Sequence, residues 1–385
     1  MIPFLDLRQI NSPYIQELEE ASLQVVRSGW YLLGESLTSF ENAFSAYCEA
    51  EYCVGVANGL DAISLILKAF DFPPESEVIL AANTYIATLL PVTALGLTPV
   101  LAEPDPATML LNPELLENHI TGKTRAIITT DLYGRSCEMA PILSIAEKHG
   151  IKVITDAAQA HGARYRGRRA GSMAHATAFS FYPTKNLGAL GDAGAVVTSD
   201  RAVAERIRYL RNYGSLVRYQ NEYQGVNSRL DEIQAAFLNI KLPYLDRDNA
   251  RRKSIARRYL EEISLEEARL PPSDRIDDDV WHLFVIQYPY RDRLKQYLAE
   301  KGIQADIHYP TPIHRQNAYP NLSHLQLPVT EKLSREVLSL PLHPALTDDE
   351  VSRIIRVINL YKTAIGSQQS ETSPGGRAAN NLSHE

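Results

Sequence analysis

The sequence is poor in cysteine, has no long apolar run and carries only a small excess of charge. Its 385 residues include three cysteines, Cys48, Cys53 and Cys137. An odd number without a Cys-x-x-Cys pair supports neither a disulfide framework nor a cysteine-based zinc site, so a reducing cytoplasm is the expected location. No stretch of about 18 apolar residues occurs, and the N-terminus lacks the basic and apolar regions of a signal peptide. We therefore expect no membrane partner.

The charge balance is mildly acidic and argues against one class of partner. The net charge of −7 results from 46 acidic against 39 basic residues. A dedicated nucleic-acid binder needs a net basic face, so we expect no nucleic-acid partner. The segment 247–258 is locally basic and leaves a basic binding helix as an alternative, although an ordinary solvated helix face is favoured. Average hydrophobic (45%) and charged (22%) contents exclude a chain that is disordered throughout.

Short apolar runs alternate with helical stretches through the first half of the chain. Strands are expected at 54–57, 77–82, 99–102, 125–130, 152–156, 176–181 and 194–198. Helices are expected at 12–28, 58–69, 84–95 and 140–149, and a further helix is expected to start at 112–113. Near-continuous apolar strands separated by helices predict an α/β fold with a mostly parallel central sheet covered by helices. Ligands bind outside the carboxyl ends of strands in such sheets, so the residues that follow the strands are candidate site residues.

The pattern changes after residue 227. A long helix interrupted at Pro243 is expected over 228–260. Strands at 280–288 and 303–308 and helices at 292–301, 331–338 and 347–361 are expected to follow, the last opened by a Thr347–Glu350 capping box. We predict a large α/β domain over 1–245, a smaller α+β C-terminal domain over 246–365 and a disordered tail over 366–385.

Four positions after predicted strands carry side chains that together indicate one ligand. Lys185 follows an aromatic strand end, Asp156 ends an apolar strand, Gly59 opens a helix and Tyr85 follows another strand. Each alone has an ordinary structural explanation, such as a surface lysine or a helix cap. Together they offer an amine nucleophile, a carboxylate, a helix N-terminus for a phosphate and an aromatic ring. Pyridoxal 5′-phosphate (PLP) needs this combination, so we predict PLP as the cofactor.

Three segments carry a family resemblance: DAAQAHGA at 156–163, FSFYPTKNLGALGDAGAVVT at 179–198 and YQGVNSRLDEIQAA at 223–236. With them, the sequence resembles the DegT/DnrJ/EryC1/StrS sugar aminotransferases over nearly its whole length, from FLDL at 4–7 to the final helix. The resemblance implies the fold type I aminotransferase architecture and a homodimer with active sites at the subunit interface.

The resemblance also implies roles around the cofactor ring. Lys185 is the catalytic residue, which binds PLP as a Schiff base and then moves the proton between substrate and cofactor. Asp156 keeps the ring nitrogen protonated. Gln159 lies near the ring oxygen, and Tyr85 stacks on the ring.

Further contacts are implied at the phosphate and the substrate. Gly59 and Leu60 donate backbone N–H groups to the phosphate, Ser180 donates a hydroxyl, and Asn227 reaches it from the partner subunit. The implied substrate contacts are Tyr31, Arg229 and Tyr309.

Two positions depart from the family pattern, and one histidine pair suggests a different site. Leu60 stands where the family often has Ser or Thr, so a hydroxyl contact to the phosphate is missing. Asp131 stands where many members have His, so the resemblance assigns this position no pocket role. His308 and His314 lack helical ligand spacing and an acidic partner set, so no metal is predicted.

The predicted reaction is transamination, because position 185 is Lys and not the His of dehydratase relatives. The resemblance implies transfer of an amino group from L-glutamate to a nucleotide-linked keto-sugar. SGWYLLG at 28–34, NGLDA at 58–62 and NTYIAT at 83–88 are similar to the branch that acts on dTDP-3-keto-6-deoxyhexoses. We therefore predict a dTDP-3-amino-3,6-dideoxyhexose transaminase that serves O-antigen, S-layer or antibiotic glycans. A 4-keto-sugar nucleotide aminotransferase and a non-catalytic PLP-binding regulator on the same scaffold are the alternatives.

Overall fold

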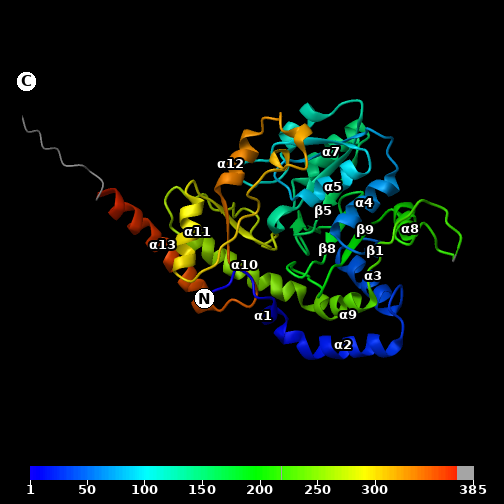
Figure 1. Ribbon diagram of the computed structural model, residues 1–385, viewed down its shortest axis with the longest axis horizontal. Coiled ribbons are helices and arrows are strands. Elements are labelled where there is room, and N and C mark those ends of the chain that lie inside the picture. Colours follow the sequence, from blue (N-terminus) through cyan, green and yellow to red (C-terminus); the bar gives the residue numbers. More distant parts are fainter. Residues whose placement is uncertain (218, 371–385) are drawn as a thin grey trace, which may run out of the picture.

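A seven-stranded sheet forms the centre of the molecule (Figure 1). The computed structural model describes residues 1–217 and 219–370. The strands are β1 (Tyr52–Val56), β2 (Glu77–Ala81), β3 (Thr98–Ala102), β4 (Thr124–Thr130), β5 (Lys152–Asp156), β8 (Ala176–Ser180) and β9 (Gly194–Thr198). Their order is β1-β9-β8-β5-β4-β2-β3, and within this sheet β9 alone runs antiparallel to its neighbours. The predicted α/β class with a mostly parallel sheet is confirmed.

Helices cover both faces of this sheet. They are α3 (Glu35–Tyr47), α4 (Gly59–Phe70), α5 (Ile86–Ala94), α6 (Pro113–Leu116), α7 (Met139–His149) and α8 (Arg201–Leu210). Successive residues of β2 point to opposite faces: Val78 and Leu80 pack with α4, α5 and α8, while Ile79 and Ala81 pack with α6 and α7. Burial on both faces explains why the strands read as continuous apolar runs. The helices α3 and α8 were missing from the sequence prediction.

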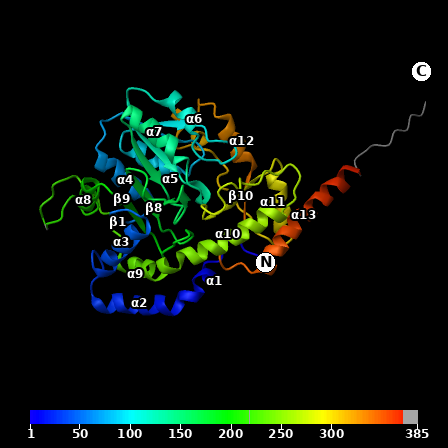
Figure 2. The same cartoon turned by 180° about the vertical axis from the view of Figure 1, so that it is seen from behind.

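Long helices run along one side of the molecule. α1 (Leu7–Asn11) and α2 (Ile15–Ser28) begin the chain, and α2 packs against α9 (Glu232–Lys241). A 3-10 turn at Leu242–Tyr244 separates α9 from α10 (Leu245–Glu262), and Figures 1 and 2 show α9 and α10 following one another. The expected interruption at Pro243 is present, but the helix begins at Glu232 and not at 228.

The C-terminal part contains a two-stranded antiparallel sheet. It consists of β10 (Phe284–Gln287) and β11 (Val337–Leu340), accompanied by α11 (Arg291–Glu300), α12 (Pro328–Glu336) and α13 (Asp348–Ser370). A small hairpin, β6 (Arg164–Tyr165) with β7 (Arg168–Arg169), lies between β5 and β8 in the sequence. The capping box of α13 is confirmed, because Glu350 N donates to Thr347 Oγ1 (3.2 Å) and Thr347 N donates to Glu350 Oε2 (2.9 Å).

Two sequence predictions for this part were wrong. The segment 303–308 is not a strand, since it makes only isolated bridges at Ile303 and Asp306. The helix predicted over 331–338 ends at Glu336, because the buried residues of β11 pair with β10 instead. The disorder predicted for 366–385 stays a prediction: α13 extends to Ser370, and residues 371–385 lie outside the described part. The domain boundary at 245 stays a prediction. Within the described residues, no helix is long and apolar enough to cross a membrane.

Candidate active site

A cavity of about 670 Å³ opens at the carboxyl edge of the central sheet. Residues that follow β1, β2, β4, β5 and β8 line it, together with His282, His308 and Tyr309 from the C-terminal part. Eight of the residues predicted from the sequence lie in its wall: Gly59, Leu60, Tyr85, Asp156, Gln159, Ser180, Lys185 and Tyr309. The volume lies in the range of small-molecule and cofactor sites.

Lys185 stands in a tight loop just after β8. Its backbone N donates to Tyr182 O (2.8 Å), and a Cβ on Gly188 would lie 2.4 Å from Pro183 O, so the loop closes on itself only with glycine there. Lys241, which is buried in α9, donates from Nζ to Asn11 Oδ1 (2.9 Å) and to Gly188 O (2.5 Å), and so holds this loop from behind.

The Lys185 amine is desolvated. Burial lowers its pKa to about 8, and the negative charge of Asp156 partly opposes this shift. A lysine with such a pKa has a much larger neutral fraction near pH 7 than an exposed lysine. The neutral amine is the form that attacks a carbonyl carbon, so Lys185 is suited to covalent catalysis.

Asp156 ends β5 as a buried carboxylate without a cationic partner in contact. Thr88 Oγ1 donates to its Oδ2 (2.7 Å) and Ala158 N donates to its Oδ1 (3.1 Å). Burial raises its pKa, and across the described residues no Lys, Arg or His nitrogen forms an ion pair with it. A buried carboxylate in this state favours an incoming cationic N–H donor. The protonated nitrogen of a pyridine ring fits that requirement.

The N-terminus of α4 meets Ser180 at the other end of the cavity. Asn58 caps this helix by accepting from Asp61 N (2.8 Å), which leaves the N–H groups of the first turn directed out of the helix. A Cβ on Gly59 would lie 2.7 Å from Ser180 Cβ, so glycine permits this close approach. Free N–H groups, the helix dipole and the Ser180 hydroxyl fit a phosphate group. Leu60 lines the same place and offers its backbone but no hydroxyl.

Three side chains form the wall between these two ends. Gln159 accepts at Oε1 from Tyr133 N (2.6 Å) and donates from Nε2 to the Tyr309 hydroxyl (3.0 Å). The rings of Tyr85 and Tyr309 lie 5.1 Å apart between centroids. Rings at this distance contact each other, so they form one aromatic side of the cavity that Lys185 and Asp156 also line, against which a flat heteroaromatic ring can lie.

The remaining predicted residues lie outside the cavity of the single chain. Asn227 is exposed, and Arg229 Nη1 donates to Asn212 Oδ1 (3.1 Å). Tyr31 is 56% exposed and donates its hydroxyl to Val26 O (3.3 Å). The predicted roles of Asn227, Arg229 and Tyr31 stay predictions.

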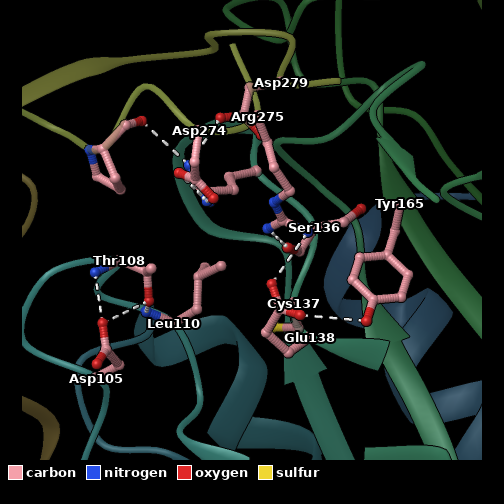
Figure 3. A network of polar contacts seen from close by, with 12 residues as sticks. Asp105, Thr108, Leu110, Ser136, Cys137, Glu138, Tyr165, Asp274, Arg275 and Asp279 are labelled. Carbon is pink, nitrogen blue, oxygen red and sulfur yellow. Dashed lines mark hydrogen bonds and ion pairs between the residues drawn. The ribbon is translucent and has the colours of Figure 1, made fainter. Parts of the chain in front are cut away.

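Asp131 does not line the cavity and has a local structural role. Its carboxylate accepts from Cys137 N (2.9 Å) and Ser136 Oγ (3.1 Å), and burial raises its pKa to about 6. The loop with Ser136 and Glu138 also contacts the segment 272–282. Arg275 donates to Ser136 O, and its Nη1 lies 3.4 Å from Glu138 Oε1 (Figure 3).

Residues that sequence reasoning missed complete the wall. His282, His308 and Thr84 line the cavity, and Thr88 orients Asp156. Thr84 and Thr88 lie in the segment 83–88, and His308 directly precedes the predicted residue Tyr309, whereas His282 belongs to a distant segment that the fold brings to the sheet edge. The described residues contain no group of three or more His, Cys, Asp or Glu side chains placed to hold a metal ion.

The basic segment 247–258 is mostly paired within the chain. Arg257 and Lys253 contact Asp277 (3.2 and 3.6 Å), and Arg258 contacts Glu262 (2.7 Å). Arg252 is buried and donates to Leu342 O (3.0 Å). These contacts favour a paired helix face over a polyanion-binding surface.

Comparison with known proteins gives consistent matches along the chain. The profile of the DegT/DnrJ/EryC1/StrS aminotransferase family matches residues 14–359. A curated relative from Aneurinibacillus thermoaerophilus, a dTDP-3-amino-3,6-dideoxy-alpha-D-galactopyranose transaminase, is 52% identical over 361 residues, which cover 94% of this chain and 99% of the relative.

Two solved structures have folds similar to that of this chain. DesV of S. venezuelae, in complex with a ketimine intermediate, has a TM-score of 0.92 at 45% identity and covers 94% of this chain and 98% of its own. NtdA of Bacillus subtilis, with the bound cofactor PMP, has a TM-score of 0.86 at 32% identity, over 93% of this chain and 84% of its own.

Proposed function

Because the chain belongs to the DegT/DnrJ/EryC1/StrS aminotransferase family, we propose that it is a PLP-dependent sugar-nucleotide transaminase. It moves an amino group from L-glutamate to C-3 of a dTDP-linked 3-keto-6-deoxyhexose and so makes a dTDP-3-amino-3,6-dideoxyhexose. The observation that carries this proposal is the pairing, in one cavity, of a desolvated lysine with a buried carboxylate that lacks a cationic partner. The relative that makes a 3-amino-3,6-dideoxyhexose supports the position of the amine on the sugar.

Different residues of the cavity have different roles in this reaction. When bound, PLP supplies the electron sink for the carbanion that forms as the substrate carbon loses its proton. Lys185 would hold the cofactor covalently, and its free amine would accept the proton from the substrate carbon and return it. Asp156, oriented by Thr88, keeps the ring nitrogen protonated. Gln159 and Tyr85 keep the ring in its plane between these groups.

The phosphate is held by a neutral set of donors. The first turn of α4 and the Ser180 hydroxyl bind it, and among the described residues no lysine or arginine lines the cavity at that end. Asn227 adds a donor from a second copy of the chain, which explains its exposure in the single chain.

A homodimer with shared active sites belongs to this proposal. Trp30, Tyr31, Leu216 and Val217 are 55–63% exposed, and large apolar side chains left exposed in the single chain are available for a subunit interface. Light scattering coupled to size-exclusion chromatography tests this point, and a monomer at micromolar concentration would contradict it.

The biological setting proposed is a cytoplasmic pathway to O-antigen, S-layer or antibiotic glycans. The decisive test is a panel of dTDP-linked 3-keto and 4-keto sugars with L-glutamate, in which product mass reports amine transfer. Turnover of the 3-keto substrates supports the proposal, and turnover of 4-keto substrates alone would contradict the position of transfer. Failure with both panels in PLP-loaded protein would favour the non-catalytic regulator. Lys185→Ala is expected to abolish turnover, whereas the exposed Lys123→Ala serves as the control.

A further inference from the structure

Lys241 is a buried lysine that contacts the loop with the reactive Lys185 from outside the cavity wall. Its side chain belongs to α9 and is 8% exposed. Burial lowers its pKa to about 8, and the negative charge of Asp248 partly opposes this shift. A buried ammonium is unfavourable unless hydrogen bonds satisfy it, so the acceptors of Lys241 bear directly on its role.

The first acceptor is a backbone carbonyl of that loop. Lys241 Nζ donates to Gly188 O (2.5 Å), three residues after Lys185. Gly188 is buried, and no other hydrogen bond to this carbonyl occurs in the described part of the chain. Without the lysine, the carbonyl would be a buried polar group with no partner, and the loop would have to shift until water reached it.

The second acceptor connects the loop to the N-terminal helices. Lys241 Nζ also donates to Asn11 Oδ1 (2.9 Å), and Asn11 is the last residue of α1. One ammonium can serve both acceptors at once, because it carries three N–H donors. Lys241 therefore joins the end of α1 to the loop with Lys185.

Two neutral side chains of α9 and α10 hold the loop on either side of this contact. Leu190 N donates to Gln234 Oε1 of α9 (2.9 Å), and Asn186 Nδ2 donates to Asn249 Oδ1 of α10 (2.9 Å). The three contacts fall at alternate residues, so the segment that follows the reactive lysine is held along its length. Only the contact of Lys241 involves a charged group among these three, and hydrogen bonds to charged groups are stronger than neutral ones.

We propose that Lys241 is a positioning residue for Lys185: its ammonium fixes the loop at Gly188, and the fixed loop keeps the Lys185 amine away from bulk water. This inference rests on the proposed function, in which that amine must be available in its neutral form. The position of the amine is decisive, because burial lowers the Lys185 pKa whereas the charge of Asp156 raises it. A loop released from Lys241 lets water reach the amine, so its pKa moves back toward 10.5 and its neutral fraction at pH 7 falls.

The test measures the Lys185 pKa in the full-length protein freed of cofactor. The protein is labelled with trace acetic anhydride from pH 6 to 11, and peptide mass spectrometry compares Lys185 with the exposed Lys123. We expect the Lys185 pKa near 8 in the wild type and about one unit higher in Lys241→Met, which keeps an apolar stem but has no donor. An unchanged Lys185 pKa in Lys241→Met would overturn the proposal.

The Lys241→Gln variant covers a Lys241→Met protein that fails to fold. Its amide is an uncharged donor on a shorter side chain, so it satisfies the buried acceptors only in part. We expect a Lys185 pKa above the wild-type value but below that of Lys241→Met. A wild-type Lys185 pKa in Lys241→Gln would overturn the role of the ammonium.

The Arg291→Met variant is the matched control for a general loss of stability. Arg291 is 7% exposed and also donates to two backbone carbonyls, Ser334 O (3.0 Å) and Val337 O (3.1 Å), outside the cavity wall. We expect its replacement to lower the unfolding temperature and to leave the Lys185 pKa unchanged. An equal rise of the Lys185 pKa in Arg291→Met would overturn the proposal, because general loosening would then account for the effect.

These measurements use protein without cofactor, so they are independent of turnover. A wild-type protein that transaminates, while Lys241→Met keeps the wild-type Lys185 pKa, refutes this inference alone. A wild-type protein that transfers no amine, while Lys241→Met raises the Lys185 pKa, refutes the proposed function alone.

Discussion

Replacing Asp156 by Asn is expected to have opposite effects on cofactor affinity and on the stability of the cofactor-free protein. The carboxylate is buried, burial raises its pKa, and no cation contacts it within the described residues. Asparagine can keep both local hydrogen bonds, with its oxygen toward Ala158 N and its NH₂ toward Thr88 Oγ1, which can then donate to Thr84 (2.8 Å). The substitution thus removes a buried charge and keeps a partner for both local hydrogen bonds.

The magnitude of the binding effect follows from the lost charge-assisted hydrogen bond. Such a bond is worth about 1.5–3 kcal/mol, so PLP affinity is expected to fall roughly tenfold to a hundredfold. The stability effect has the opposite sign. Because the pKa of Asp156 is higher in the folded state than in the unfolded state, the free energy of unfolding of the wild type decreases as the pH rises above about 3.8. The Asp156→Asn variant has no carboxylate at this position and does not show this decrease. The cofactor-free variant should therefore unfold at equal or higher temperature at pH 7, with the advantage shrinking in acid.

The assay is a PLP titration by absorbance together with thermal unfolding of the cofactor-free protein. Asp192→Asn is the matched control, because Asp192 lines the same cavity but is exposed, and we expect neither quantity to change. Unchanged PLP affinity in Asp156→Asn would refute the reasoning. A clear loss of stability in the cofactor-free variant would refute the account of the buried charge.

Three further predictions concern other parts of the structure. Gly59→Ala places a Cβ 2.7 Å from Ser180 Cβ, so we expect a stability loss of about 1–3 kcal/mol in urea unfolding and weaker PLP binding; wild-type affinity would contradict the phosphate role of α4. Asp131→Ala leaves Cys137 N without its acceptor, so we expect a loss of about 1–3 kcal/mol in the free energy of unfolding and an unchanged PLP affinity. A large loss of PLP affinity would instead show that Asp131 contributes to cofactor binding. Burial lowers the pKa of His161 to about 3, so the unfolded state takes up the proton first as the pH falls below about 6.5, and stability decreases by up to about 1.4 kcal/mol per pH unit; His161→Phe should flatten this slope, and an unchanged slope would contradict it.

The elements predicted well are those whose signals are local. Residues 152–156 were predicted as a strand and form β5, because this short segment centres on the β-branched apolar residues Val153 and Ile154. Asn58 was recognised beside Gly59 as a helix start, and its side chain indeed caps α4. Apart from Tyr309, the predicted residues that meet in the cavity all end or follow strands of the central sheet, and the parallel sheet brings such positions to one edge.

The elements missed depend on partners far away in the sequence. The run Val337–Leu340 has no strand signature of its own and becomes β11 through pairing with β10. His282 reaches the cavity because the segment before it is bound to the loop after β4, where Val280 N donates to Gly134 O (2.9 Å). Neither contact can be inferred from local spacing, since each requires the folded position of a second segment.

The central claim is that Lys185 holds PLP covalently in this cavity. The most direct measurement is reduction of the PLP-loaded protein with sodium borohydride, followed by proteolysis and peptide mass spectrometry. We predict that the Schiff-base absorbance band near the edge of the visible range disappears on reduction. We also predict that the added mass of a reduced pyridoxyl phosphate is found on Lys185. A label on another lysine, on Lys241 for instance, or a band that persists in Lys185→Ala, would contradict it.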